Sequence, residues 1–141
     1  MKRFTIAVSF AFAVAALTVA FAAAATTPKH ATVLIRHQMA HCHAWAFDNG
    51  KFGAAASGTV AKGATITFTN NDVMPHKLIL KSGPIPTFKG TPLLNKMGAS
   101  VIVSFPKAGT YVFGTKVGED YMKGVKTTGE DNVLTLKITV K

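Results

Sequence analysis

The sequence is short of cysteine, of acidic residues and of long helical patterns, and each shortage excludes a class of protein. It has one Cys in 141 residues, so no disulfide can form within the chain. It has 6 Asp and Glu against 16 Lys and Arg, a formal net charge of +10. The sequence shows no Cys-x-x-Cys motif and no pattern typical of a catalytic nucleophile with its base or of a paired-carboxylate site, since Glu119 and Asp120 are neighbours in a polar loop. The sequence therefore predicts a protein that is not an enzyme.

The one long apolar run lies at the N-terminus. Residues 1–25 begin with Lys2 and Arg3, continue as an Ala-rich stretch and end in three alanines, which is typical of a secretory signal peptide and its cleavage site. The alternative is an uncleaved membrane anchor, because the apolar run is long enough to span a bilayer. We expect cleavage, a secreted or periplasmic protein and no membrane attachment afterwards. Residues 26–30 then form an N-terminal tail and residues 31–141 a single domain.

The excess of positive charge bears on partners. A basic exported protein can meet an acidic protein, a membrane surface or nucleic acid. Nucleic acid is disfavoured because the lysines are scattered and no basic run occurs. The simplest interpretation of the positive charge is a solvated basic surface without a partner. If the charge has a function, we expect the protein to be a monomer that binds an acidic redox partner.

Short β-branched runs separated by Gly, Asn and Pro dominate the rest of the chain and predict strands. We expect strands over residues 32–35, 64–69, 76–80, 100–105, 110–115 and 133–140. Residues 83–98 are the least regular stretch, and residues 118–131 form a long polar loop. The regular spacing of strands and turns predicts an all-β protein, an antiparallel β-sandwich. Its expected core contains Ile66, Phe68, Leu78, Val103, Phe105, Tyr111, Phe113, Leu136 and Ile138, with Trp45 and Phe47.

Residues 37–43 concentrate groups that bind metals. His37, Met39, His41, Cys42 and His43 supply three imidazoles, a thioether and the only thiol. Together these groups are the ligand set of blue-copper sites. In one regular strand the alternation of side chains would place Cys42 on the face opposite the histidines. Cys42 and His43 can therefore share a metal only if the chain bends there.

The chain resembles the cupredoxins, small Greek-key β-sandwiches that carry copper. The matching segments are residues 60–72, with a Lys-Gly turn and a strand ending Asn-x-Asp, Pro75-His76, and residues 103–113, with a Phe-turn-Gly-x-Tyr-x-Phe pattern. The resemblance rests on the order and spacing of these segments and covers residues 31–141. The resemblance implies a cupredoxin-like Greek-key antiparallel β-sandwich of seven or eight strands, with copper as the cofactor.

The resemblance makes His76 the first copper ligand. In the family a Cys, a second His and often a Met follow the Gly-x-Tyr strand. Here Thr115 takes the position of that Cys, no His follows it, and only Met122 remains. The family fold also implies that the stretch after the first strand crosses the end of the sandwich that holds His76, so Cys42 and His43 can replace the missing ligands.

The expected metal ligands are therefore Cys42, His43, His76 and Met122. Secondary candidates are His37, His41 and Met39, and a harder site would recruit Glu119 or Asp120. The function this implies is that of an exported copper-binding protein that carries one electron at a time in the cell envelope. Two alternatives stay open: copper handling (delivery or tolerance), and a metal-free binding module of the same fold.

Overall fold

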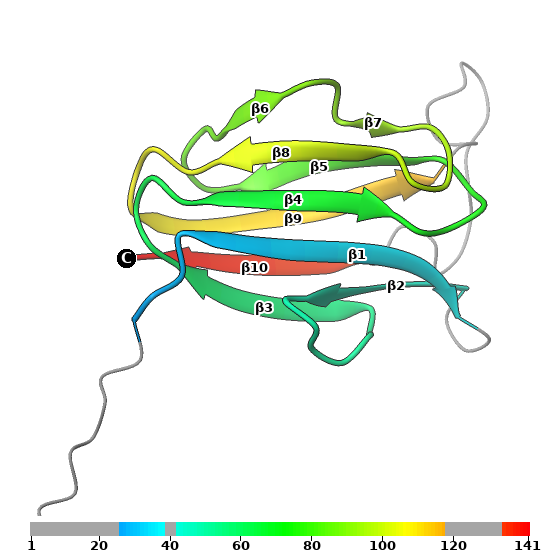
Figure 1. Ribbon diagram of the computed structural model, residues 1–141, viewed down its shortest axis with the longest axis horizontal. Helices are drawn as coiled ribbons and strands as arrows, with labels where there is room; N and C mark the ends of the chain where they lie inside the picture. The colour runs from blue at the N-terminus through cyan, green and yellow to red at the C-terminus, as the bar shows by residue number, and fades with distance from the viewer. Residues whose placement is uncertain (1–25, 39–41, 118–133) are drawn as a thin grey trace, which may run out of the picture.

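The computed structural model describes residues 26–38, 42–117 and 134–141, without the side chains of residues 38, 42 and 117. Within these ranges ten strands form two five-stranded sheets that pack face to face as a β-sandwich (Figure 1). The strands are β1 (His30–Gln38), β2 (Cys42–Phe47), β3 (Ala55–Val60), β4 (Thr65–Asn70), β5 (His76–Ser82), β6 (Thr87–Lys89), β7 (Leu93–Leu94), β8 (Ser100–Ser104), β9 (Gly109–Val117) and β10 (Thr135–Val140). The ranges include no helix long and apolar enough to cross a membrane.

The predicted fold class is confirmed, with two differences in detail. Sheet 1 has the order β2-β1-β4-β8-β6 and sheet 2 the order β3-β10-β9-β5-β7. The described ranges hold ten strands instead of seven or eight, because the irregular stretch 83–98 contributes the very short β6 and β7, and residues 30–47 contribute two paired antiparallel strands, β1 and β2. Two of the pairings, β1 with β4 and β3 with β10, are parallel, while the others are antiparallel.

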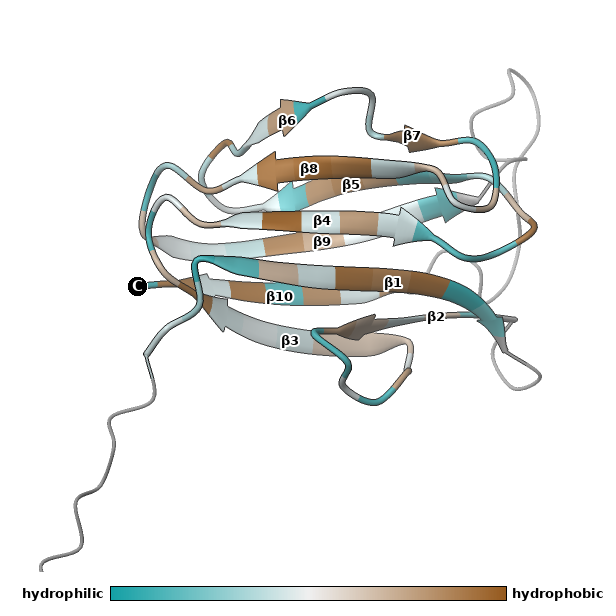
Figure 2. Cartoon of the chain, viewed as in Figure 1, coloured by the Kyte–Doolittle hydropathy of each residue, from teal (hydrophilic) through white to brown (hydrophobic). Residues whose placement is uncertain are grey.

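The core lies between the sheets and follows from the alternation of side chains along each strand. In β4 the apolar residues are buried and the threonines between them only half-buried, and β10 repeats this pattern. Figure 2 shows the apolar residues within the strands and hydrophilic residues in most of the connections. The nine residues expected in the core, from Ile66 to Ile138, are all buried. Trp45 and Phe47 were expected there as well.

Trp45 and Phe47 close the side of the sandwich where β2 approaches β3. Trp45 is fully buried, and its indole N–H donates to the Thr135 carbonyl of β10 at 3.2 Å. Phe47 is partly buried and covers Gly58, where a Cβ atom would meet the Phe47 ring at 2.4 Å. Trp45 is thus a core residue as expected, and Phe47 packs at the margin of the core.

The two ends of the sandwich are built differently. One end, at the left of Figure 1, holds the Lys62-Gly63 turn, the 105–109 turn and the C-terminus. There the Phe105 and Tyr111 rings meet edge to face at 4.9 Å, and the Tyr111 hydroxyl donates to the Lys107 carbonyl at 2.7 Å. We call it the aromatic end. At the opposite end lie the paired residues Gln38 of β1 and Cys42 of β2 and the β4–β5 connection, and we call it the histidine end.

Candidate metal centre

The β1–β2 hairpin brings two of the candidate histidines together. Residues 37–43 do not form one strand: β1 ends at Gln38, β2 begins at Cys42, and the two strands pair antiparallel. His37 therefore lies directly opposite His43, and their ring centroids are 5.8 Å apart. Cys42 occupies the position opposite Gln38. The side chain of Cys42 and all of Met39 and His41 lie outside the described residues.

His76 reaches the same place from the other sheet. It is the first residue of β5, where it pairs with Val117 of β9 and Leu94 of β7, and it is fully buried. Its ring lies edge to face with that of His43, at a centroid distance of 4.9 Å. The stretch after the first strand thus meets His76 at one end of the sandwich, as the family resemblance implies. Each sheet contributes one of these two buried imidazoles.

Asp72, in the β4–β5 connection, links the two rings and was missed by the sequence analysis. Its carboxylate is fully buried, and Oδ2 accepts a hydrogen bond from His43 Nδ1 at 2.6 Å. The same oxygen lies 3.3 Å from His76 Nε2. The Asn-x-Asp pattern marked this residue only as part of a turn. The available signal was its position four residues before His76, which brings both side chains to one end of the sandwich.

Asn70 holds the connection that carries Asp72. Its Oδ1 accepts from the Asp72 backbone N–H at 2.8 Å, and its Nδ2 donates to the carbonyls of Met74 and Leu94 at 2.8 and 3.1 Å. The Met74 backbone N–H in turn donates to Asp72 Oδ1 at 3.0 Å. Since Asn70 is itself fully buried, these bonds fix the loop without help from solvent.

The surroundings keep Asp72 ionised. Burial by itself raises the pKa of this carboxyl, but the hydrogen bonds from the Met74 N–H and from His43 and His76 outweigh burial and leave the pKa below its ordinary value. A buried carboxylate that remains charged needs a positive or hydrogen-bonding partner. For Asp72 those partners are the Met74 N–H and the imidazoles of His43 and His76.

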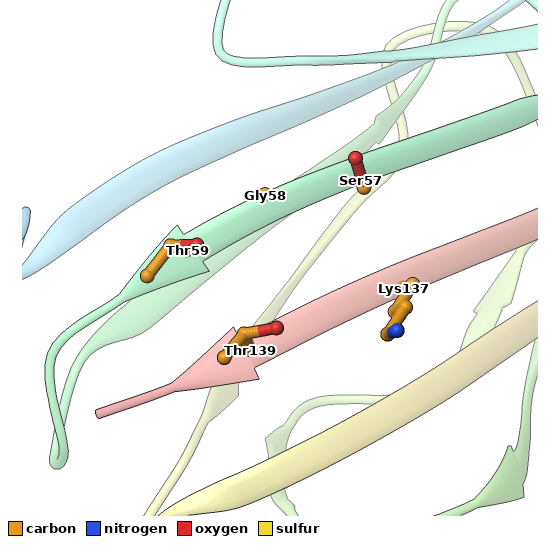
Figure 3. Close-up of a pocket in the computed structure, with 5 residues that line it drawn as sticks. All are labelled: Ser57, Gly58, Thr59, Lys137 and Thr139. Carbon is orange, nitrogen blue, oxygen red and sulfur yellow. The ribbon is translucent and has the colours of Figure 1, made fainter.

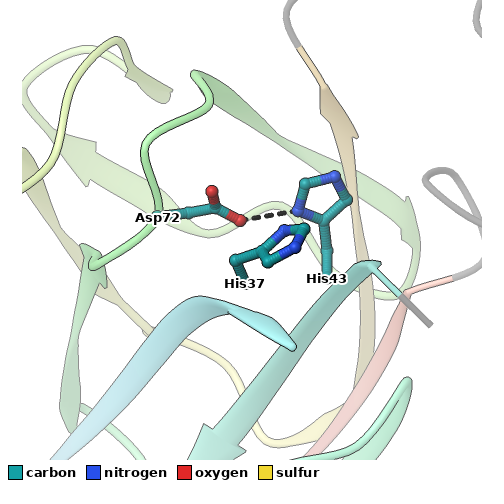
Figure 4. A group of neighbouring side chains, drawn as sticks. All are labelled: His37, His43 and Asp72. Carbon is teal, nitrogen blue, oxygen red and sulfur yellow. Dashed lines mark hydrogen bonds and ion pairs between the residues drawn. The ribbon is translucent and has the colours of Figure 1, made fainter. Parts of the chain in front are cut away.

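Three of these side chains form a compact donor group. One donor atom each from His37, His43 and Asp72 lies within 4.8 Å of the other two, and the three side chains face a common point (Figure 4). Donor atoms around a tetrahedral ion with bonds of about 2.0–2.1 Å are spaced by about 3.4 Å. Imidazole and carboxylate donors suit Cu(II) and Zn(II), so the residues fit a metal of this kind. His37 is exposed and gives the group access to solvent.

The other candidates lie beside this group or outside the described residues. Thr115, at the position of the family Cys, is buried, and its hydroxyl makes no hydrogen bond within the described part of the chain. It stands two residues before Val117, which pairs with His76. Met122, Glu119 and Asp120 fall in residues 118–133 and are outside the described ranges.

A shallow depression on the outer face of sheet 2 lacks metal ligands. Figure 3 shows it on β3 and β10, lined by Ser57, Gly58, Thr59, Lys137 and Thr139. These residues provide hydroxyls and one amine, with no imidazole, thiol or carboxylate. Among the described residues, the chemistry of a metal site is therefore found at the histidine end.

Comparisons with known proteins give similarities of structure. No family model matches the sequence, and no curated protein matches it. A purple cupredoxin from Nitrosopumilus maritimus is 18% identical, with 79% of this chain and 99% of that chain covered and a TM-score of 0.46. Amicyanin from Paracoccus versutus is 14% identical, with 85% and 86% covered and a TM-score of 0.45. The chain is similar in structure to these cupredoxins.

Proposed function

We propose that this protein is an exported copper-binding protein that carries one electron at a time. One observation carries the proposal: His43 and His76, from different sheets, lie side by side in the buried histidine end and share the carboxylate of Asp72. Two imidazoles are common to copper sites, and copper supplies the one-electron couple when bound. The localisation, secreted or periplasmic, follows from the signal peptide expected over residues 1–25.

The residues around the site favour electron transfer because they restrain its geometry. His43 sits within β2, His76 begins β5, and the connection between β4 and β5 is held by the bonds of Asn70. Ligands that move little between two oxidation states keep the reorganisation on transfer small. Cys42, next to His43, and Met122 are the further ligands of the proposal; His37, His41 and Met39 are secondary ones.

Copper titration of the metal-free mature protein tests this function. We expect one equivalent of copper to bind, a reversible couple in voltammetry, and visible thiolate absorption that Cys42→Ser removes while His30→Ala leaves it intact. His30 is a suitable control because it is exposed at the start of β1 and bonds only Thr65 among the described residues. Copper binding without a reversible couple would refute the electron-carrier role.

Copper handling is the second candidate, favoured by the exposure of His37 beside the buried His43. An exposed imidazole next to buried ones offers an entry path for an ion delivered from outside. A protein of this kind binds Cu(I) tightly and passes it to an acceptor without a reversible couple. Transfer of Cu(I) to a chelator, followed over time in wild type and His37→Ala, separates the roles: slower transfer in the variant supports handling, and equal rates contradict it.

The charge of the described surface supports an acidic redox partner. The described ranges contain two acidic residues, Asp48 and the buried Asp72. Lys77 and Lys116 stand directly opposite each other on β5 and β9, both exposed, next to the His76 pair. Such a surface speeds the encounter with a negatively charged protein, and added salt slows it. A rate of electron exchange with an acidic partner that does not depend on ionic strength would contradict this part of the proposal.

A further inference from the structure

We infer that Asp72 is itself a metal ligand, and that with His37 and His43 it holds a divalent cation, Zn(II) or Cu(II), without the thiol of Cys42. The inference rests on the proposed function only in placing the metal at the histidine end. It differs in its donor set, which is made of nitrogen and oxygen, and in the class of ion that this set selects.

The position of Asp72 Oδ2 is the first argument. This oxygen lies 2.6 Å from His43 Nδ1 and 3.3 Å from His76 Nε2, and the carboxylate belongs with His37 and His43 to the group whose donor atoms lie within 4.8 Å. The other oxygen, Oδ1, is held by the Met74 backbone N–H. The carboxylate is thus fixed by the loop through one oxygen and presented to the imidazoles through the other.

Burial of the charge is the second argument. Asp72 is fully buried, and buried carboxylates in proteins are paired or coordinate metals. Without metal, imidazole N–H groups provide the only positive ends described around Oδ2. A divalent cation among the same atoms neutralises the carboxylate more fully. The shortest contact of 2.6 Å and the limit of 4.8 Å on the spacing of the donor atoms lie on either side of the spacing of about 3.4 Å expected around a tetrahedral ion.

The identity of the donors decides the class of ion. Imidazole and carboxylate suit divalent zinc and copper, whereas thiolate and thioether favour Cu(I). The affinity order of divalent ions places Cu(II) above Zn(II) at such a site. His37 and His43 from β1 and β2, together with Asp72, provide all three protein ligands of this site. Its zinc affinity therefore does not require Cys42.

The test uses Zn(II) alone as the probe, in a Cys42→Ser background. We expect this variant to bind one equivalent of Zn(II). Adding Asp72→Asn should lower its zinc affinity by more than about 100-fold, since loss of a carboxylate that only orients a ligand costs about 10–100-fold. Asn retains an oxygen for the Met74 N–H and so preserves the loop. Asp48→Asn is the matched control: it removes the same charge in the turn after β2, where a φ of 46° suits Asn, and should leave zinc binding unchanged.

A second variant and a crystal structure guard against misfolding and misassignment. His37→Ala alters an exposed side chain, so the fold should persist while zinc affinity falls by at least about 100-fold, and His30→Ala should change nothing. In a crystal of the zinc complex, an Asp72 oxygen should lie about 2.0–2.2 Å from the metal. An Asp72 oxygen in the outer sphere, or zinc affinity lost with Cys42→Ser alone, overturns the inference.

The two proposals fail separately. If wild type shows no reversible copper couple while Cys42→Ser still binds zinc through Asp72, electron transfer fails and the inference stands. If the couple is present and Asp72→Asn costs less than about 100-fold in zinc affinity, Asp72 only orients His43 and the inference fails.

Discussion

The aromatic end and the histidine end close the same sandwich with opposite chemistry. At the aromatic end the buried side chains are Phe105, Tyr111 and their apolar neighbours, and the Tyr111 hydroxyl reaches a backbone carbonyl. At the histidine end lie the buried polar residues of the described chain: His43, Asn70, Asp72, His76 and Thr115. Between the two ends, the strands of both sheets bury apolar side chains in one core.

The contrast separates stability from function. Burial of apolar surface stabilises a fold, whereas burial of polar groups costs free energy unless every group is hydrogen-bonded. A protein that needed only a stable sandwich would be better served by an apolar cluster at both ends. The proposed metal site would account for the polar cluster at one end, which is held by the bonds of Asn70.

Phe105→Ala should have the largest effect and should act on stability alone. The ring is fully buried against Tyr111 and Phe113, and truncation of such a residue costs about 3–5 kcal/mol in the free energy of unfolding. Copper affinity of the folded variant should equal that of wild type. Denaturant unfolding and copper titration measure both quantities; a matching loss of copper affinity would show that the two ends are not independent.

His43→Ala should act chiefly on copper affinity, with a smaller loss of stability because the buried Asp72 loses a partner. It removes a proposed ligand and the partner of Asp72 Oδ2, so copper affinity should fall by more than about 100-fold, beyond the range of outer-shell changes. Calorimetric titration of the metal-free protein measures the loss, with His30→Ala as the control at the other end of β1. Retention of wild-type affinity would place the copper elsewhere.

Asn70→Ala should affect both properties, because this residue joins the fold to the site. It would leave the Asp72 N–H and the carbonyls of Met74 and Leu94 without their partner, and each unsatisfied buried group costs about 1–3 kcal/mol. We also expect about 10–100-fold weaker copper binding, as for a residue that positions a ligand. Unfolding and titration of the same sample test this; a change in stability with full copper affinity would restrict Asn70 to the fold.

Tyr111→Phe should have the smallest effect. It deletes only the hydroxyl that donates to Lys107, a bond worth about 0.5–1.5 kcal/mol, and leaves the ring packing unchanged. Thermal unfolding measures the decrease, and copper affinity serves as the internal control. A loss as large as that of Phe105→Ala would mean that the hydroxyl, and not ring burial, holds the aromatic end together.

The strands were predictable because their pattern is local. In β4 and β10 the apolar residues alternate with polar ones, and the expected strands at residues 64–69 and 133–140 match these elements to within two residues. The expected strand at residues 32–35 lies within the longer β1, whose exposed His37 end breaks the apolar pattern. The short β6 and β7 carry too few residues to show any alternation.

The site was only partly predictable because it depends on tertiary contacts. His43 and His76 were expected together from the family resemblance, and their rings are adjacent. His37 was ranked lower because its place opposite His43 requires the reversal between β1 and β2. Asp72 was missed because a turn residue becomes a buried partner of imidazoles only when the fold brings His43 of β2 and His76 of β5 against it. The ligand roles of Cys42 and Met122 stay predictions.

Histidine ring resonances in NMR, recorded while diamagnetic Cu(I) is added to the mature protein, test the central claim most directly, because they compare the two ends within one molecule. We predict that the His43 and His76 signals change and reach saturation at one equivalent of copper, while the signals of His30, at the start of β1, stay in place. Changes of equal size at His30, or unchanged signals from His43 and His76 at one equivalent, would contradict the claim that the histidine end is the copper site.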